Sequence, residues 1–272
     1  MRAAREHGFT FLDDARYNDE TGTAPIPTGY SEVVFGELFR AAAWDRGETV
    51  VANKLWWEFW PSQSAAEELD GSLGRMGFDY IDLIYANPPP DELPIPEMVA
   101  AIGELLRSGK ARAWAIVNWQ AEPFLEASNA AREQGVPQPC AAQLPYSLVR
   151  RDWVESAAMS RALAASGADV VASFVMAGGV LTGKYERGAG GRAAPELADP
   201  RLADARACGR ELLRLGGELG VGAAALAIAF ALANPAVASV LLGATSPEQI
   251  AENVRALDLG PEVVQRLREL GS

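Results

Sequence analysis

The stretch Thr49–Tyr85, TVVANKLWWEFWPSQSAAEELDGSLGRMGFDYIDLIY, contains a short β-type run, an amphipathic helical run and a second β-type run. The two β-type runs are Thr49–Ala52 and Tyr80–Tyr85, and the helical run between them is Ser64–Met76. Strand, helix and strand in this order are typical of a parallel βαβ unit. The stretch therefore predicts an α/β fold with a parallel sheet.

The same alternation extends along the whole chain. Further β-type runs are Thr10–Leu12, Ala113–Val117, Ala141–Leu144, Val170–Phe174 and Ala238–Leu242. Helical patterns separate them, at Pro96–Arg107, Glu122–Glu133, Asp152–Ala165, Ala203–Leu219 and Pro247–Leu257. A length of 272 residues suits a single α/β barrel. We therefore predict one barrel domain over residues 1–272.

The seven predicted strands are one fewer than the eight that close a parallel barrel. An open edge of apolar strands favours aggregation, so a further strand is expected. Because Arg2–Glu6 resembles the end of a helix that leads into Thr10–Leu12, we expect this first strand to precede Met1. The domain is then short at its N-terminus. The alternative hypothesis is that a chain without this strand does not fold.

Loops and helix starts also leave signals in the sequence. The stretches Asn18–Gly29 and Glu186–Pro200 are rich in residues that favour loops. Long loops of this kind act as lids or binding loops about as often as they form plain surface excursions. Ser246, followed by a proline, has Gln249 three residues later and resembles a capping box. Ser31 is expected to open a helix in the same manner.

Composition excludes several classes of partner. A formal net charge of -12 argues against a nucleic acid or an acidic membrane as partner. Cys140 and Cys208 are too few and too far apart for a disulfide framework or a zinc site, so we predict no metal and a reducing, cytoplasmic location. Met1–Phe9 lacks an apolar run, and the apolar stretch Val221–Leu232 is too short to span a bilayer. The sequence indicates no particular oligomeric state.

Polar residues follow the predicted strands at their carboxyl ends, where a barrel of this kind assembles its active site. A lysine entering such a site is costly unless a carboxylate partners it, and Asp13 is the expected partner of Lys54. The pair is either a structural salt bridge or a device that tunes a neighbouring acid. Tyr17 is the candidate acid, because an adjacent ammonium eases the release of a phenolic proton. The polar residues are Asp13, Asp14, Lys54, Asn87, Asn118, Gln143 and Ser173.

Several ordered motifs resemble those of the aldo-keto reductases across nearly the whole chain. Gly8–Ala15, GFTFLDDA, is similar to the motif that carries the family's catalytic aspartate, and Val51–Lys54, VANK, to the motif that carries its lysine. Gly179–Tyr185, GVLTGKY, closely resembles another family motif. Gly243–Gln249, GATSPEQ, followed by Glu252–Asn253, resembles the motif that binds the cofactor phosphate.

The resemblance implies a (β/α)8 TIM barrel and a nicotinamide cofactor, NADPH in preference to NADH, bound without the glycine-rich dinucleotide fingerprint. It implies that Asn118 and Gln143 hold the carboxamide of the nicotinamide. Lys184 is implied at the pyrophosphate, unless it is an ordinary surface lysine. The residues implied at the adenosine end, where main-chain amides at a helix start favour phosphate, are Gly243, Thr245, Gln249, Glu252 and Asn253.

This chain departs from the family at the position of its catalytic histidine, where it has Asn87. An amide donates a hydrogen bond to a carbonyl oxygen but does not relay a proton, so we expect slow or substrate-restricted turnover. The same replacement, within Ala86–Pro89, resembles the potassium-channel β-subunits and their relatives.

Two aromatic positions also differ from the family. Its tyrosine falls where this chain has Asn18, so either the loop shifts to present Tyr17, which we prefer as proton donor, or Tyr30 enters from the end of the long loop. Ser173 replaces an aromatic ring that stacks on the nicotinamide. Phe174 is expected to point the other way by strand alternation, so cofactor binding is expected to be weaker by about 1 kcal/mol.

A group of aromatic residues follows the strands that carry Lys54 and Asn118. Such a group can belong to the core, but its place in loops at the site end favours a substrate pocket for a flat or apolar carbonyl compound. The predicted pocket residues are Trp56, Trp119 and Tyr30.

These observations lead to two hypotheses. The leading one is an NADPH-dependent oxidoreductase that reduces an aldehyde, ketone or enone of a small organic substrate by hydride transfer. Its catalytic residues are Asp13, Tyr17, Lys54 and Asn87. The alternative is an NADPH-binding, redox-responsive regulatory subunit with little or no turnover.

Overall fold

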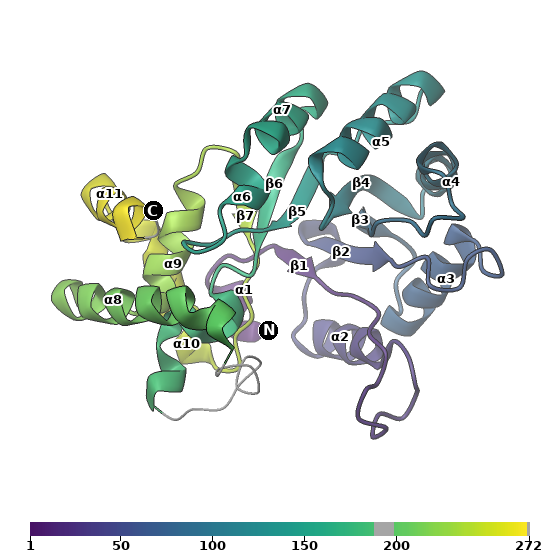
Figure 1. Cartoon of the computed structure of the whole chain (residues 1–272). Coiled ribbons are helices and arrows are strands. Elements are labelled where there is room, and N and C mark those ends of the chain that lie inside the picture. Colours follow the sequence, from purple (N-terminus) through teal and green to yellow (C-terminus); the bar gives the residue numbers. More distant parts are fainter. Residues whose placement is uncertain (188–198, 271–272) are drawn as a thin grey trace. The chain divides into compact units, whose positions relative to one another are not determined.

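The structure is a computed structural model that describes residues 1–187 and 199–270. Seven parallel strands alternate with helices along the chain (Figure 1), so the predicted α/β class is confirmed. The strands are β1 Phe11–Asp13, β2 Val50–Leu55, β3 Ile81–Ala86, β4 Ala111–Val117, β5 Ala141–Pro145, β6 Asp169–Ser173 and β7 Val237–Val240. The helices are α1 Arg2–Glu6, α2 Tyr30–Ala41, α3 Ala65–Met76, α4 Ile95–Arg107, α5 Ala121–Gln134, α6 Asp152–Glu155, α7 Ala157–Ser166, α8 Ala203–Leu219, α9 Ala223–Leu232, α10 Pro247–Val254 and α11 Pro261–Leu270.

Every predicted strand overlaps an observed one, and the described residues contain no eighth strand. The strand expected before Met1 and the single domain over residues 1–272 stay predictions. The predicted loop Glu186–Pro200 lies largely outside the described residues. The loop Asn18–Gly29 is described, and an antiparallel bridge between Asn18 and Thr28 closes it.

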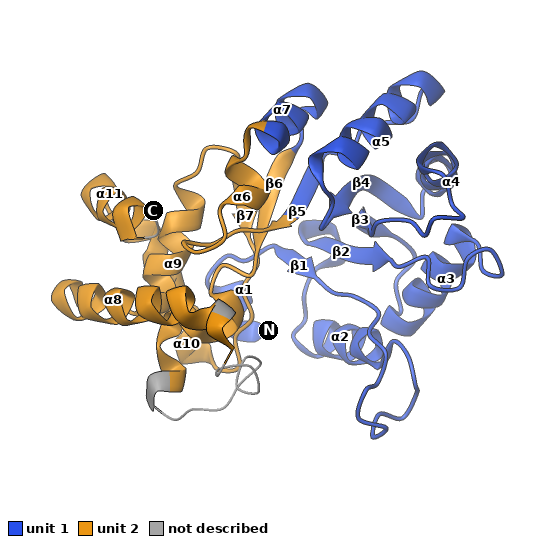
Figure 2. Cartoon of the chain, in the orientation of Figure 1, with its two compact units in different colours: residues 1–143, 158–168 blue, residues 144–157, 169–272 orange. Residues whose placement is uncertain are grey.

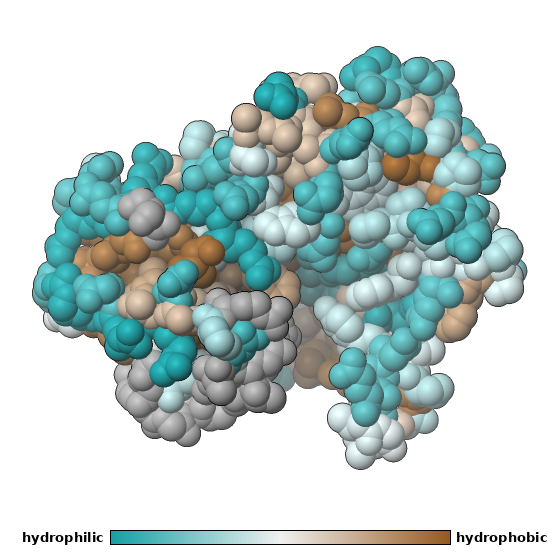
Figure 3. All heavy atoms as spheres, in the orientation of Figure 1, coloured by the Kyte–Doolittle hydropathy of each residue, from teal (hydrophilic) through white to brown (hydrophobic). Residues whose placement is uncertain are grey.

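The chain forms two compact units, which Figure 2 distinguishes by colour. Unit 1 consists of residues 1–143 and 158–168, and unit 2 of residues 144–157 and 169–272. In unit 1, consecutive strands from β1 to the start of β5 are paired in parallel. In unit 2, β6 and β7 are paired in parallel. On the face of unit 1 seen in Figure 3, hydrophilic side chains predominate, in keeping with a net charge of -12.

Strand register brings the polar residues of unit 1 to one face of the sheet. Residues paired between parallel strands point to the same face, and so do residues two apart along a strand. Asp13 pairs with Ala52, two residues before Lys54, and Lys54 pairs with Tyr85. From Tyr85 the register continues through β4 to Gln143 on β5. Asp13, Lys54, Tyr85 and Gln143 therefore share one face.

The opposite face of β2 is tied to the helices. Asn53, next to Lys54 in the chain, is buried and donates its amide to Glu32 Oε1 of α2 at 2.7 Å. The other oxygen of the Glu32 carboxylate accepts a hydrogen bond from Arg75 Nε of α3 at 2.5 Å. Glu32 is fully buried, and its carboxylate therefore needs partners. Arg75 balances its charge, and Asn53 and Arg75 each donate a hydrogen bond to one of its oxygens. This contact fixes α2 and α3 against β2.

The helix boundaries predicted around two serines are partly wrong. The pattern Asp152–Ala165 is split, because the backbone of Ser156 is extended between α6 and α7. Ser31 is not a helix cap. Gly29, with a φ of 77°, is the N-cap of α2, and Ser31 Oγ donates to the carbonyl oxygen of Ala15 at 2.7 Å. A serine one residue inside the first helical turn is free to bond outside the helix.

The apolar stretch noted in the sequence forms α9, whose side chains are almost all buried. Within residues 1–187 and 199–270, no single helix is long and apolar enough to cross a membrane. The consecutive helices α8 and α9 meet that test of length and composition only as a pair, and the chain bends by 101° between them.

Gly36 of α2 provides the first test. A Cβ atom there would lie 2.0 Å from the main-chain oxygen of Met76, the last residue of α3, so nothing but glycine fits between the two helices. We expect Gly36→Ala to lower the free energy of unfolding by about 2–3 kcal/mol through overpacking. Chemical denaturation measures this change.

Gly74→Ala in α3 is the matched control, because a Cβ atom at Gly74 meets no atom within 4 Å. The same substitution there should raise stability by roughly 0.5–1 kcal/mol, since alanine favours the helix more than glycine does. Equal effects of the two substitutions would contradict the close contact at Gly36.

Candidate active site

A buried ion pair lies at the carboxyl ends of β1 and β2. Lys54 Nζ lies 2.9 Å from Asp13 Oδ1 and 2.8 Å from Asp13 Oδ2, and it also donates to the main-chain oxygen of Asp14 at 3.1 Å. Only 7% of the Lys54 side chain and 17% of the Asp13 side chain are exposed. The predicted partnership of Lys54 and Asp13 is therefore present, with all three ammonium hydrogens engaged.

Burial governs the ionisation of both aspartates. It raises the pKa of Asp13, and the Lys54 ammonium, with its hydrogen bonds, opposes this rise. Gln143 Nε2 approaches Asp13 Oδ1 at 3.4 Å, which is a long contact for a hydrogen bond. Burial also raises the pKa of Asp14 to about 6, and the hydrogen bond from the Ala15 amide opposes this rise. Burial thus raises the pKa of both carboxyls, and that of Asp14 lies closer to neutrality than the pKa of an ordinary aspartate.

The loop after β1 carries the candidate proton donor. Tyr17 is 57% exposed, and its ring contacts that of Trp56 edge to face with 6.0 Å between the ring centroids. Trp56 follows Lys54 by two residues and lies just past the end of β2. Tyr30, the alternative donor, is 37% exposed and is the first residue of α2. The contact with Trp56 connects the Tyr17 loop to the strand end that carries Lys54.

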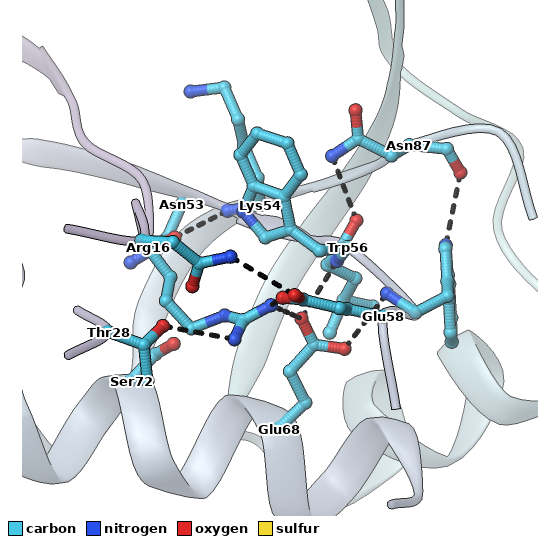
Figure 4. A network of polar contacts seen from close by, with 12 residues as sticks. Arg16, Thr28, Asn53, Lys54, Trp56, Glu58, Glu68, Ser72 and Asn87 are labelled. Carbon is cyan, nitrogen blue, oxygen red and sulfur yellow. Dashed lines mark hydrogen bonds and ion pairs between the residues drawn. The ribbon is translucent and has the colours of Figure 1, made fainter. Parts of the chain in front are cut away.

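A charged network beneath this loop escaped the sequence analysis. Arg16, of which 6% is exposed, donates to Glu58 Oε2 at 2.7 Å and lies 3.9 Å from Glu68 Oε1. Glu68 accepts the main-chain N–H groups of Trp56 and Trp57 at 2.8 and 3.2 Å. Figure 4 shows Arg16 between these carboxylates, with the Lys54 side chain pointing away from Glu68. The network fixes the backbone of the aromatic loop.

The signal that could have revealed this network is weak. Arg16 occurs in a loop and Glu68 in an amphipathic helix, where charged residues are ordinarily exposed. Only the fold shows that both are buried and close together.

Asn87 is fixed at the end of β3. Its side-chain Nδ2 donates to the main-chain oxygen of Leu55 at 3.0 Å (Figure 4). The main-chain oxygen of Asn87 accepts the indole N–H of Trp57 at 3.0 Å. Trp119 is buried and donates its indole N–H to Ala86 at 2.9 Å, which is a core position. Its predicted role in a substrate pocket stays a prediction, as does that of Trp56.

The two residues predicted at the nicotinamide carboxamide are neighbours in unit 1. The main-chain N–H of Asn118 donates to the carbonyl oxygen of Gln143 at 2.9 Å. Asn118 is exposed and has a φ of 60°, a left-handed conformation that asparagine tolerates better than most residues. The turn after β4 thus joins the backbone of Asn118 to that of Gln143.

In unit 2, the strand that carries Ser173 ends at that residue. Ser173 is buried, and its carbonyl oxygen accepts the N–H of Tyr146 at 2.9 Å. Phe174 has a φ of 55° and is 50% exposed. Strand alternation therefore does not extend to Phe174, and the predicted direction of its side chain has no basis in the observed backbone.

Lys184 lies against a glycine of the preceding turn. A Cβ atom at Gly179 would lie 2.8 Å from Lys184 Cε, so the lysine stem crosses the backbone there. Lys184 Nζ lies 4.9 Å from the ring centroid of Tyr185. The ammonium is thereby held near the turn rather than extended into solvent.

The predicted adenosine residues gather at the start of α10 and beside α9. Ser246 caps α10 by accepting the Gln249 N–H at 3.4 Å, but the Gln249 side chain accepts the N–H of Thr245 at 2.7 Å, so the capping box is only half formed. Glu252 accepts the N–H of Gly222 at the start of α9. Asn253 is buried. Gly243 precedes this segment, and a Cβ atom there meets no atom within 4 Å.

No three His, Cys, Asp or Glu side chains gather as metal ligands in residues 1–187 and 199–270. The groups brought together in unit 1 are instead an ammonium, carboxylates, amides and a phenol. Such a set polarises and hydrogen-bonds a small polar ligand.

Comparison with known proteins agrees with this arrangement. The model of the aldo/keto reductase family matches residues 1–272. The chain belongs to the aldo/keto reductase family of NAD(P)H-dependent oxidoreductases. The resemblance found in the sequence is thus confirmed.

Three relatives are potassium-channel β-subunits by name. A probable voltage-gated potassium channel subunit beta of Oryza sativa subsp. japonica is 34% identical over 286 residues, covering 98% of this chain and 84% of the relative. A probable subunit of Arabidopsis thaliana is 32% identical, covering 96% and 81%. A putative subunit of Schizosaccharomyces pombe is 31% identical, covering 89% and 76%. The predicted likeness to this branch of the family is also confirmed.

Asp14 provides a test of the electrostatics. Its pKa is raised in the folded protein, so the stability it contributes is present below the ordinary value of 3.8 and is lost as the pH rises through about 6. Asp14→Asn keeps the carboxyl group's shape without its charge. We expect the variant to be more stable than the wild type by about 2 kcal/mol at pH ~8 and equal to it at pH ~4, as measured by urea denaturation.

Asp19→Asn is the control, and it should lower the free energy of unfolding at high pH where Asp14→Asn raises it. Hydrogen bonds from Thr21 and Ala24 lower the pKa of the exposed Asp19 carboxyl, so that ionisation of this group favours folding above its usual pKa. A stability gain of Asp14→Asn that does not depend on pH would contradict the role of ionisation.

Arg16→Met tests the charged network. Removing Arg16 leaves the buried Glu68 carboxylate without its nearest cation, so we expect a loss of roughly 3 kcal/mol in the free energy of unfolding. Arg107→Met, which breaks an exposed pair with Glu104, is the matched control and should change stability by less than about 0.5 kcal/mol. Similar losses of stability in both variants would show that the Arg16 network contributes no more to the free energy of unfolding than an exposed ion pair does.

Proposed function

We propose that the protein reduces a carbonyl group of a small organic substrate, an aldehyde, ketone or enone, with NADPH as the cofactor. The observation that carries this proposal is the buried pair of Lys54 and Asp13 at the strand ends. A fixed cation at the carboxyl ends of parallel strands, in a chain of this family, suits a reaction in which negative charge develops on oxygen.

Lys54 provides the positive charge in this proposal. Its ammonium is oriented by Asp13 and by the carbonyl of Asp14, so that little rearrangement is needed when charge develops nearby. Tyr17 donates a proton to the carbonyl oxygen of the substrate. The edge-to-face contact with Trp56 supports this role, because it joins the Tyr17 loop to the strand that carries Lys54.

Asn87 orients the substrate oxygen in this proposal. A side-chain amide nitrogen has two hydrogens, and one of them is donated to Leu55. Within the part of the chain that the structure describes, no acceptor takes the second, which is therefore proposed to bind the substrate. Because an amide does not relay protons, turnover is expected to be slow. Trp56, Trp119 and Tyr30 are the proposed pocket residues.

The residues present fit a nicotinamide cofactor, which supplies the hydride when it is bound. The amide side chains of Asn118 and Gln143 come from residues joined by a main-chain hydrogen bond, and two amides together match the donor and acceptor of a carboxamide. In unit 2, Ser173 is the proposed contact of the nicotinamide and Lys184 that of the pyrophosphate. The proposed contacts at the adenosine end are Gly243, Thr245, Gln249, Glu252 and Asn253.

A second candidate function is a redox-responsive regulatory subunit that binds NADPH with little turnover. The names of the three relatives favour it, since all are channel β-subunits. This candidate predicts NADPH binding without carbonyl reduction, together with a stable complex with a voltage-gated potassium channel.

The proposed chemistry is tested by three variants assayed for NADPH oxidation with a panel of aldehydes, ketones and enones. Tyr17→Phe and Lys54→Met should each lower kcat by about 100-fold or more, because they remove the proton donor and the cation that assists it. NADPH binding by titration calorimetry should change much less in Tyr17→Phe.

Tyr30→Phe is the control and should keep most of the activity. A loss in Tyr30→Phe but not in Tyr17→Phe would assign proton donation to Tyr30. If the wild type binds NADPH but reduces no member of the panel, the regulatory function is favoured instead.

A further inference from the structure

Tyr85 of β3 is a fully buried phenol on the same face of the sheet as Lys54 and Gln143. Its side chain has 0% exposure, and Lys54 Nζ lies 5.5 Å from its ring centroid. Among the described residues, its hydroxyl has no hydrogen-bond partner. The sequence pattern gives Tyr85 no predicted role, since it occurs in an apolar strand.

A buried hydroxyl without a partner is unfavourable, because it loses its hydrogen bonds to water and gains nothing in return. Phenylalanine would fill nearly the same space without that cost. The presence of a tyrosine therefore suggests that the hydroxyl finds its partner in another state of the protein.

The groups next to this hydroxyl indicate the partner. Lys54 Nζ, which is 2.9 Å from Asp13 Oδ1, lies 5.5 Å from the centroid of the Tyr85 ring, so Tyr85 and Asp13 flank the same ammonium, and Gln143 lies on the same face of the sheet. Burial raises the pKa of Tyr85 and the Asp13 charge raises it further, while a weak interaction of the hydroxyl with the Gln143 side chain lowers it. A phenol that stays protonated is a donor. Asp13 Oδ1 has a strong contact with Lys54, but only the long 3.4 Å contact with Gln143 on its other side.

We propose that Tyr85 is a positioning residue for cofactor binding, which donates its hydroxyl to Asp13 when the Gln143 amide turns away to hold the nicotinamide carboxamide. This inference rests on the proposed function, in which Gln143 binds that carboxamide. Without the Tyr85 hydroxyl, the departure of Gln143 would leave a buried carboxylate oxygen short of a donor. Tyr85 thereby lowers the cost of cofactor binding without touching the cofactor.

Tyr85→Phe tests the proposal with two measurements, because it should not destabilise the cofactor-free protein but should weaken NADPH binding. In the cofactor-free protein, thermal melting should occur at the same temperature or a few degrees higher, because an unpartnered hydroxyl is removed. By titration calorimetry, the Kd for NADPH should rise about tenfold, the loss expected when a hydrogen bond to a charged group is missing from the bound state.

Tyr146→Phe is the matched control. Tyr146 is as deeply buried, but its hydroxyl bonds Glu155 and accepts from Asn234 at 3.0 Å. The same substitution there should lower the melting temperature of the cofactor-free protein and leave the Kd for NADPH unchanged.

A double variant shows whether Tyr85 acts through Gln143. In Gln143→Ala, the amide is absent from both the free and the bound protein, so adding Tyr85→Phe should leave the Kd for NADPH unchanged within about twofold. A full tenfold effect in this background would overturn the proposed exchange of partners.

The remaining outcomes are also decisive. If Tyr85→Phe lowers the melting temperature as Tyr146→Phe does, the hydroxyl has a partner in the cofactor-free protein and the inference is wrong. The inference is equally wrong if the Kd for NADPH is unaltered in Tyr85→Phe while the wild type binds NADPH. Absence of NADPH binding by the wild type would overturn the proposed function as well as this inference.

Discussion

The contact between the Lys54 ammonium and the Asp13 carboxylate is the interaction on which the site in unit 1 depends. Both groups are largely removed from water, and a single buried charge of either sign costs several kcal/mol. The pair therefore has to be kept together, and the register of β1 against β2 does this, because Asp13 pairs with Ala52, two residues before Lys54. A shift by one residue would turn Lys54 towards the helices and leave Asp13 alone in an apolar interior. The same contact thus places the charged groups of the site and favours the correct pairing of β1 with β2.

The end of β2 is held from both of its faces. On one face Lys54 bonds Asp13, and on the other Asn53 bonds the buried Glu32, which Arg75 compensates. Beyond the strand, Glu68 accepts the N–H groups of Trp56 and Trp57, and Arg16 approaches Glu68 from the loop after β1. Each of these contacts involves a buried charged group. Removing one partner would leave that group without its hydrogen bond or counter-charge, which is costly in the protein interior. Such a strand end has little freedom to move, which suits a cation that must hold its place as charge develops on a substrate.

Periodicity and local motifs predict the strands of unit 1 well, because each is a short apolar run whose face is set by alternation. The pair of Lys54 and Asp13 also follows from sequence, since both residues end such runs. Arg16 and Glu68 could not be predicted in this way, because their burial depends on how a loop and a helix pack together. Tyr85 was missed for a related reason: a tyrosine in an apolar strand is ordinary, and only the completed fold shows that its hydroxyl has no hydrogen-bond partner among residues 1–187 and 199–270. The direction of Phe174 does not follow from alternation, because this residue lies one position past the end of β6, where φ is 55°.

The replacement of a histidine by Asn87 changes which groups respond to pH. The chain has one histidine, His7, and it lies exposed at the end of α1, where its Nδ1 contacts the Ala3 carbonyl at 2.8 Å. Apart from the Tyr85 phenol, the described groups of unit 1 whose pKa is raised are the carboxyls of Asp13, Asp14 and Glu68, and burial is the largest cause in each case. An imidazole changes its charge near neutrality without help, whereas a carboxyl does so only when the fold withholds water from it. Packing around the strand ends, rather than the identity of the residue at position 87, therefore sets the pH at which the charge around Lys54 changes.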